Sequence, residues 1–261
     1  KAFNFSKLLQ RIPELKLLDC EIETISFENP IDSSNMNPGQ WVQIASMIEE
    51  NYANFDGFVV LHGSDTMSYS ASALSFMFEN LSKPIIFTGS QLPIGDLRTD
   101  AKENLITAIQ IASLQEEGKP VITEVCLYFE YKLYRGNRTT KINAEHFNAF
   151  ASPNFAPLIE AGIDIKLVAG KLSQQQLAAP LQVASITPQP ISVVTLYPGI
   201  STDVIRNMTT APVRALIIKS FGVGNAPQRP ELLKILRDAS ARGLIIVNCT
   251  QCFKGTVNMQ G

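Results

Sequence analysis

The chain has 261 residues, of which 45% are hydrophobic and 18% are charged, and its formal net charge at pH 7 is −2. This composition is typical of a compact soluble protein with one large domain or two moderate ones. The small net charge argues against a nucleic-acid or membrane-surface partner. No apolar run reaches the roughly 20 residues that cross a bilayer, so we expect neither kind of partner.

The first part of the chain alternates between helical and strand-like patterns. Apolar spacing predicts a helix over residues 5–18, interrupted by Pro13, and a strand over residues 22–27. A polar loop at residues 32–37 leads into an amphipathic helix at 41–52. The apolar run at residues 58–61 predicts a strand buried on both faces, which passes through Gly63 into a helix from Met67.

The alternation continues with a strand at residues 83–89, a helix at 98–113 and a strand at 121–129, which predicts a parallel sheet. Periodicity then fades between residues 131 and 157. Residues 171–190 are rich in Gln, Ala and Pro and predict an interdomain linker. A second strand–helix series follows, with strands at 192–196, 213–218 and 244–247. We therefore predict an N-terminal domain at 1–170, a linker at 171–190 and a C-terminal domain at 191–261 that is incomplete at its end.

The turn after residues 58–61 is the clearest sign of a functional site. Gly63 permits a tight turn, and Ser64, Asp65 and Thr66 are residue types that cap helices. Hydroxyls and a carboxylate would thus lie beside free N–H groups at a helix N-terminus, at the sheet edge where α/β folds bind ligands. The alternative is that these side chains only cap the helix. The loop at 32–37 is either a solvated turn or a second polar wall beside this one.

Four cysteines, Cys20, Cys126, Cys249 and Cys252, are too few for a disulfide scaffold in a chain of this length. Cys249 and Cys252 have the spacing of half a zinc site or of a redox pair. No second pair accompanies them, and both histidines lie far away in the sequence. We therefore predict reduced thiols in a reducing compartment, with no metal site and no cofactor.

Several stretches resemble the bacterial-type L-asparaginases. The clearest is His62-Gly-Ser-Asp-Thr-Met67, which is similar to the second signature of that family. Supporting matches run over nearly the whole chain, at residues 31–36, 88–91, 134–141, 150–154, 220–227 and 250–252. Arg135-Gly-Asn-Arg-Thr-Thr-Lys141 and Gly222-Val-Gly-Asn-Ala-Pro227 are most similar to the cytosolic type I branch.

The resemblance implies a cytoplasmic amidohydrolase that converts L-asparagine to L-aspartate and ammonia. It implies two α/β domains, a larger N-terminal flavodoxin-like one with a parallel sheet and a smaller C-terminal one, assembled as a homodimer or homotetramer. Ser64 stands where the family usually has Thr and would orient the attacking water or activate the nucleophile. Asp65 would hold the substrate α-amine, and Lys141 would accept or relay the proton of the Ser64 hydroxyl.

The resemblance also assigns residues around this centre. Asp32, Ser33 and Ser34 match the loop that binds the α-carboxylate and amine of the substrate, and Ser90 falls where the scissile amide meets the main chain. The family's principal nucleophile is a threonine in a Thr-Gly-Gly-Thr motif near the N-terminus, which this sequence does not contain. We therefore expect the chain to lack that N-terminal strand and to be inactive without it.

Type I relatives carry a second, allosteric asparagine site. The positions that align with it are Thr140, Lys219, Ser220, Phe221, Thr250, Gln251 and Cys252. Lys219 replaces an arginine found in some relatives, which keeps the charge but loses the bidentate fork for a carboxylate. The alternatives to an asparaginase are an asparaginase-glutaminase of broader specificity, the related subunit of a tRNA-dependent amidotransferase, and a non-catalytic asparagine sensor.

Overall fold

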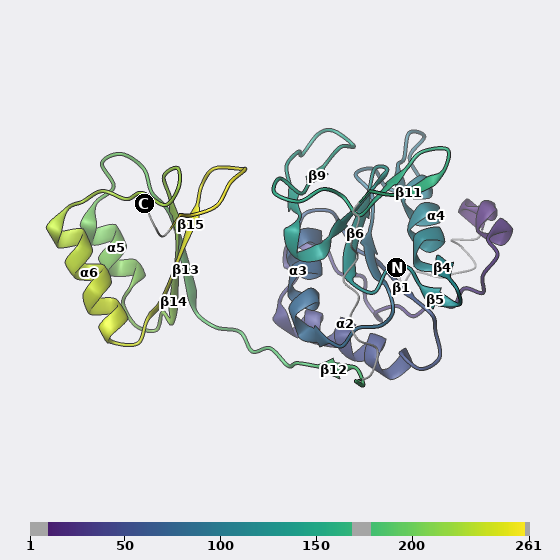
Figure 1. Ribbon diagram of the computed structural model, residues 1–261, viewed down its shortest axis with the longest axis horizontal. Helices are drawn as coiled ribbons and strands as arrows, with labels where there is room; N and C mark the ends of the chain where they lie inside the picture. The colour runs from purple at the N-terminus through teal and green to yellow at the C-terminus, as the bar shows by residue number, and fades with distance from the viewer. Residues whose placement is uncertain (1–9, 169–178, 259–261) are drawn as a thin grey trace. The chain divides into compact units, whose positions relative to one another are not determined.

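The computed structural model describes residues 10–168 and 179–258, which belong to two compact α/β units, residues 1–186 and 187–261 (Figure 1). Residues 171–178 of the predicted linker lie outside the described residues. Further along the same stretch is a short strand, β12 (Gln182–Val183), which pairs antiparallel with β2 (Phe78–Glu79). The chain therefore still contacts the first unit at β12.

The first unit contains a six-stranded sheet in the order β1-β3-β6-β7-β10-β11. Its first half, β1 (Phe58–Leu61), β3 (Ile85–Thr88) and β6 (Val125–Phe129), is parallel, as the sequence predicted. In the second half each strand runs antiparallel to the one before it. β7 (Lys132–Arg135) pairs with β6, β10 (Ile159–Ala161) pairs with β7, and β11 (Ile165–Leu167) pairs with β10. The prediction of an irregular segment after residue 131 was therefore wrong at β7.

The reversal from β6 to β7 explains why the antiparallel half was missed. Glu130 and Tyr131 link the two strands and have positive φ angles of 42° and 66°, while Phe129 pairs with Lys132 across the hairpin. Two-residue hairpins need positive φ at both central positions and usually use Asn or Gly there. Because neither residue is of that type, the sequence contains no turn signal at this point.

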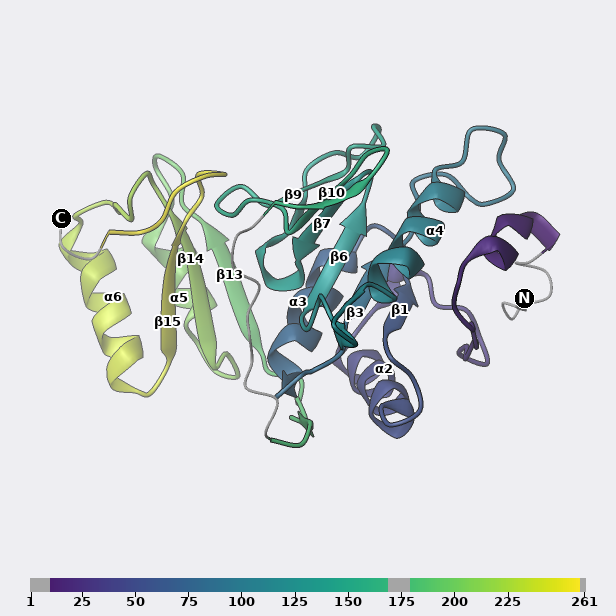
Figure 2. The ribbon, with the colours of Figure 1, turned by 45° about the vertical axis from the view of Figure 1, so that its right-hand side comes forward.

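Helices cover both faces of the parallel strands (Figure 2). α2 (Pro38–Asn51) and α3 (Met67–Met77) lie on one side, where Phe87 belongs to their core cluster. α4 (Ala101–Ala112) lies on the other side, where Ile86 packs beside it. Successive strand residues point to opposite faces, so every residue of β3 and β6 is buried, as expected for strands between two layers. β1 forms the edge of the sheet, where it is only half-buried and Leu61 is exposed, so the prediction that it is buried on both faces was wrong.

Two predicted elements near the N-terminus were wrong. Residues 22–27 form no strand within the described chain. Alternating apolar residues form a strand only where a neighbouring strand supplies partners for the backbone N–H and C=O groups. The helix expected over residues 5–18 is a short 3-10 helix at Pro13–Leu17, preceded by helical Gln10 and Arg11. Residues 5–9 lie outside the described residues. Proline has no N–H to continue a helix and is tolerated in its first turn, which is where Pro13 begins the new one.

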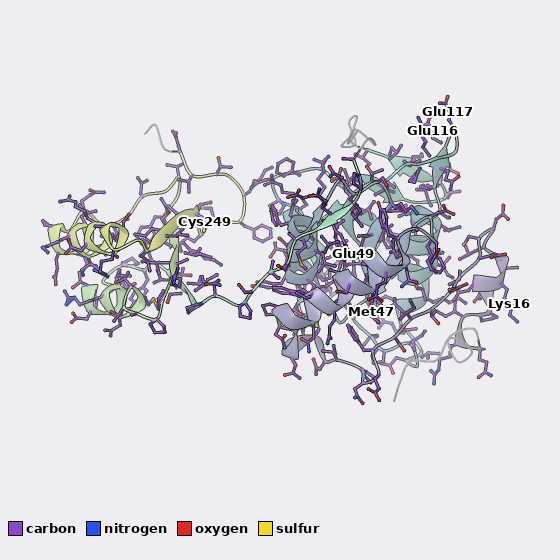
Figure 3. The ribbon with its side chains drawn as sticks, turned by 90° about the horizontal axis from the view of Figure 1, so that it is seen from below. Lys16, Met47, Glu49, Glu116, Glu117 and Cys249 are labelled. Carbon is purple, nitrogen blue, oxygen red and sulfur yellow. The ribbon has the colours of Figure 1, made fainter. Side chains whose placement is uncertain are left out.

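A small hairpin shortens the strand predicted over residues 121–129. β4 (Gln115–Glu116) and β5 (Lys119–Pro120) pair antiparallel through Glu117 and Gly118, both with positive φ. Glu116 and Glu117 mark this hairpin in Figure 3, and Met47 and Glu49 mark α2. The sheet strand β6 therefore starts only at Val125.

The second unit is a three-stranded parallel sheet in the order β13-β14-β15, formed by the three strands that the sequence predicted. Its strands are β13 (Ile191–Thr195), β14 (Ala215–Ser220) and β15 (Ile245–Thr250), joined by α5 (Thr202–Met208) and α6 (Pro230–Ala241). The two helices pack on one face through a cluster that includes Leu216, Ile205 and Leu232. Within the described residues, neither unit has a helix with the length and apolarity that a membrane span requires.

Candidate functional site

The candidate site is built on the turn between β1 and α3. The His62 N–H donates to the Thr88 carbonyl at 2.9 Å, which extends the β1–β3 pairing to the edge of the turn. Thr66 occupies the N-cap position of α3, but its hydroxyl makes no capping bond and donates instead to the Ser33 carbonyl at 2.6 Å. The Ser64 hydroxyl donates to Gln91 Oε1 at 2.8 Å. Neither hydroxyl caps the helix, so the capping interpretation of these two side chains was wrong.

Lys141 reaches this turn from a separate two-stranded ribbon. It ends β8 (Thr140–Lys141), which pairs antiparallel with β9 (Phe150–Ala151). Its Nζ lies 3.0 Å from Ser64 Oγ and 2.8 Å from Asp65 Oδ1. The predicted convergence of these three side chains is therefore confirmed. The Lys141 side chain is 19% exposed and that of Asp65 is 64% exposed, so the site opens to solvent on its carboxylate side.

The hydrogen bonds around Ser64 set the direction of its proton. An ammonium group can only donate, so Lys141 donates to both Ser64 Oγ and Asp65. A glutamine carbonyl oxygen can only accept, so the hydroxyl proton of Ser64 points to Gln91. In this resting arrangement Lys141 is a proton donor, and it must lose a proton before it can accept one from Ser64.

Gln91 and Asp100 support the site and were not among the predicted site residues. The Asp100 carboxylate accepts the N–H of Gln91 at 3.0 Å and that of Leu92 at 3.1 Å. Gln91 Nε2 donates to the His146 carbonyl at 3.2 Å, which turns Oε1 toward Ser64. The predicted helix over residues 98–113 included Asp100, whereas the observed α4 begins at Ala101. Asp100 makes no side-chain cap and holds the loop instead.

The loop at residues 32–36 forms a second wall beside the turn. The Asp32 carboxylate accepts from the Ser34 N–H at 3.0 Å and the Ser34 hydroxyl at 2.8 Å, and these bonds lower the pKa of Asp32. Asp32 and Ser34 are exposed, whereas Ser33 is buried. A Cβ on Gly63 would lie 2.5 Å from Ser33 Oγ, so the two walls are in close contact.

The remaining predicted residue of this site, Ser90, lies between Gly89 and Gln91 and is half-buried. Gly89 connects β3 to this segment and has no room for a side chain. A Cβ there would overlap the His62 carbonyl oxygen and lie 2.8 Å from Met67 Cε. The small residue is therefore required for the two turns to lie side by side.

We expect Gly89→Ala to lower the free energy of unfolding by about 1 to 3 kcal/mol, the range for overpacking a filled site. Chemical denaturation measures this directly. Gly162→Ala is the matched control, because the one described atom that a Cβ would approach there is the Asp164 carbonyl oxygen at 4.0 Å. Equal stability of the two variants would contradict the tight packing of the site.

The predicted second site divides between the two units. Lys219, Ser220, Phe221, Thr250, Gln251 and Cys252 come together at the carboxyl ends of β14 and β15, where Ser220 pairs with Thr250. The Gln251 N–H donates to the Ser220 carbonyl at 2.9 Å, and the Cys252 N–H donates to Thr250 Oγ1 at 3.0 Å. Thr140 lies in the first unit, on β8. The role of this group stays a prediction.

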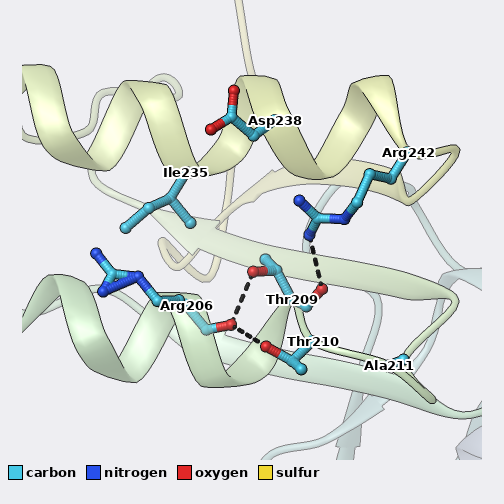
Figure 4. Close-up of a pocket in the computed structure, with 7 residues that line it drawn as sticks. All are labelled: Arg206, Thr209, Thr210, Ala211, Ile235, Asp238 and Arg242. Atoms are coloured by element: carbon cyan, nitrogen blue, oxygen red, sulfur yellow. Dashed lines mark hydrogen bonds between the residues drawn. The ribbon is translucent and has the colours of Figure 1, made fainter.

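A cavity of about 470 Å³ lies at the end of α5 (Figure 4). The Arg206 carbonyl accepts the hydroxyls of Thr209 and Thr210 at 2.9 Å each, and Arg242 donates to the Thr209 carbonyl at 3.3 Å. The Arg206 guanidinium is already paired with Asp203 and Glu231. These polar groups close the end of a helix, whose terminal carbonyls need partners, and do not converge on a ligand.

A second cavity, of about 440 Å³, runs along β1 and ends at the candidate site. It lies between residues 23–27, α2 and β1, and it reaches His62 and Gly63. Among the described residues, no three histidine, cysteine or acidic side chains are grouped to hold a metal ion. Cys126 is buried and Cys252 is exposed, and both are free thiols, as are Cys20 and Cys249.

Comparisons with known proteins agree over nearly the whole chain. The model of the N-terminal asparaginase domain matches residues 1–172, and the glutaminase/asparaginase C-terminal domain matches residues 190–261. L-asparaginase 1 of Escherichia coli is 51% identical over 259 residues, which cover 99% of this chain and 75% of that protein. The crystal structure of L-asparaginase I from Vibrio cholerae aligns with a TM-score of 0.90 at 50% identity, covering 99% of this chain and 77% of the other. The thermostable L-asparaginase of Thermococcus kodakarensis aligns with a TM-score of 0.87 at 30% identity, covering 98% and 75%.

Proposed function

The chain belongs to the asparaginase family, and on that premise we propose that it hydrolyses L-asparagine to L-aspartate and ammonia. The observation that carries the proposal is the Lys141 ammonium between Ser64 Oγ and Asp65 Oδ1, at 3.0 and 2.8 Å. A hydroxyl held by a lysine beside an exposed carboxylate is an arrangement that can bind an α-amine and move a proton at the same place.

Each group has a role in this reaction. A hydroxyl oxygen attacks the side-chain amide carbon, the C–N bond breaks, and ammonia leaves with the proton that the attacking oxygen lost; water then releases the acid. The family resemblance assigns the first attack to a threonine hydroxyl. Lys141 and Ser64 relay the proton, and Asp65 binds the substrate ammonium through a charge-assisted hydrogen bond.

The substrate's carboxylate end is assigned to the loop beside the turn. Ser34 is exposed, but its hydroxyl and its N–H both donate to Asp32 in this arrangement. Either donor would have to leave Asp32 before it could bind the substrate carboxylate, which only accepts hydrogen bonds. Ser33 is buried, so we place it in support of the loop, where its carbonyl holds Thr66. Ser90 lies next to Gln91 and is assigned to the scissile amide.

The test is release of ammonia by the natural full-length protein. We expect stoichiometric ammonia and aspartate from L-asparagine, with the rate on L-glutamine in the same assay setting the substrate preference. Binding of asparagine without ammonia release would favour the non-catalytic sensor. Ammonia release only with a charged tRNA acceptor present would favour the amidotransferase subunit.

We also propose a cytoplasmic homodimer or homotetramer in which asparagine binds at the carboxyl ends of β14 and β15. The similarity to L-asparaginase 1 and the gathering of Lys219, Ser220 and Thr250 there support this. Thr140 of a neighbouring subunit would complete the site. The family-model ranges support the proposed division into domains at 1–170 and 191–261 with a linker at 171–190.

Lys219→Ala tests the second site. The initial rate should depend on asparagine concentration sigmoidally in the native protein and hyperbolically in the variant. Regulation requires that asparagine at the second site binds the active state of the protein more tightly than the inactive state, and the variant lacks the cation that would bind its carboxylate there. A hyperbolic native curve would contradict regulation without affecting the proposed reaction. Light scattering after size-exclusion chromatography gives the oligomeric state.

A further inference from the structure

His62 lies directly before the Gly63–Ser64 peptide, and its imidazole is held at both nitrogens. Nδ1 lies 2.7 Å from the Gly63 carbonyl oxygen, and Nε2 lies 2.8 Å from Ser70 Oγ. Ser70 is completely buried on α3 and also accepts the Trp41 indole N–H at 2.8 Å. The chain of bonds thus joins α2, α3 and the turn.

The chemistry of these groups allows only one direction of donation for a neutral ring. A carbonyl oxygen only accepts, so Nδ1 must carry the proton that it shares with Gly63. In a neutral imidazole Nε2 is then an acceptor, and the Ser70 hydroxyl donates to it. The bonds therefore run from Trp41 through Ser70 and His62 to the Gly63 carbonyl. Each donor in this chain has an acceptor of the right type. Burial lowers the pKa of His62, partly offset by the bond to Gly63, which agrees with a neutral ring.

The Gly63 carbonyl controls the orientation of Ser64. The Gly63–Ser64 peptide is trans, since the one cis peptide bond within the described residues is Ala211–Pro212. A planar trans peptide places the N–H opposite the C=O, so holding the carbonyl against His62 fixes the plane from which Ser64 and Asp65 continue. Gly63 has no Cβ to restrict its backbone, and Ser33 occupies the place where a Cβ would lie. The imidazole thus supplies an orienting bond that the glycine backbone cannot supply for itself.

We propose that His62, as its Nδ1–H tautomer and held by Trp41 and Ser70, is a positioning residue that orients the Gly63–Ser64 peptide and so aims Ser64 and Asp65 at Lys141. This proposal deepens the proposed function and rests on it, because the orientation of the Gly63–Ser64 peptide affects the reaction only if Ser64 and Asp65 are site residues.

Two substitutions separate the two ring nitrogens. In His62→Asn the side-chain amide nitrogen takes the place of Nδ1 and still donates to Gly63, but the contact with Ser70 is lost. In His62→Gln the amide lies near Nε2 and contacts Ser70, but no donor faces Gly63. We expect His62→Gln to lower the asparaginase turnover number by at least about 10-fold, within the range for a misplaced reacting group, and His62→Asn to retain distinctly more activity.

A purely structural role predicts the reverse order, because glutamine fills the volume of histidine better than asparagine does. Rates are therefore compared per folded protein, with melting temperatures measured alongside. Equal or higher activity of His62→Gln would overturn the proposal.

The tautomer is tested on the native full-length protein by long-range ¹H–¹⁵N correlation of the His62 ring. A protonated Nδ1 and an unprotonated Nε2 are expected, and the opposite tautomer would overturn the proposal whether or not the variants fold. If the native protein released no ammonia, the proposed function would fail separately. Amide hydrogen exchange of Ser64 and Asp65 would then decide the positioning role: faster exchange in His62→Gln than in His62→Asn supports it, and equal exchange overturns it.

Discussion

Replacement of Lys141 by alanine is expected to lower the asparaginase turnover number by at least about 100-fold, the lower range for loss of a general acid–base group. The variant loses the only cation that contacts both Ser64 Oγ and Asp65 Oδ1 among the described residues. Folding should be affected little, because partly exposed ion pairs contribute about 0 to 1 kcal/mol. Steady-state kinetics and thermal melting of the same samples separate the two effects.

Lys234→Ala is the matched control for Lys141→Ala. Lys234 makes an ion pair with Asp238 at the same 2.8 Å, on the exposed surface of α6. It lies outside the candidate site, so its loss should leave turnover unchanged. Near-native kinetics in Lys141→Ala would refute the assignment of the proton relay, and an equal loss in both variants would point to a general effect of removing a surface lysine.

Replacement of Asp65 is expected to lower kcat/KM for asparagine by at least about 100-fold, most of it through a higher KM. Asp65 is exposed enough to meet a substrate ammonium, and hydrogen bonds between charged groups contribute roughly twice as much as neutral ones. Asp65→Asn keeps the shape of the side chain and removes the charge. It should therefore be nearly as defective as Asp65→Ala.

Asp203→Asn provides the control, since Asp203 pairs with Arg206 at 3.0 Å on the surface of the second unit. Binding of the product L-aspartate, measured by calorimetry, reports on the amine contact without turnover. If Asp65→Asn bound aspartate as tightly as the native protein, Asp65 would not be the anchor of the amine, and the proton-relay role of Lys141 would need to be judged by itself.

The sequence predicted the elements whose signal is local. The apolar runs at β1, β3 and β6 and the three strands of the second unit are each recognisable because burial on one or two faces demands a matching residue pattern. The turn at Gly63–Thr66 was found for the same reason, since glycine followed by hydroxyl and carboxylate side chains is rare inside regular structure. In contrast, β7 was missed because its hairpin uses Glu130 and Tyr131 at positive φ.

The composition of the candidate site was only partly predictable. Ser64, Asp65 and Lys141 were found through resemblance, and the structure brings the lysine to the other two across 77 and 76 residues. Gln91, Asp100 and the bonds of His62 were not found. These residues enter the site through hydrogen bonds to groups of other segments. Packing of those segments against one another decides which groups come within bonding distance.

By itself, the sequence determined the α/β class, the two strand–helix series and the chemical types of residue at the turn, because each follows from local periodicity and side-chain chemistry. Only the tertiary structure decided that Ser64 donates to Gln91, that Thr66 holds the Ser33 loop, and that Lys141 reaches across from β8. A hydrogen bond has direction and a reach of about 3 Å. Which groups come within that reach is settled by packing of distant segments, and no pattern along the chain records it.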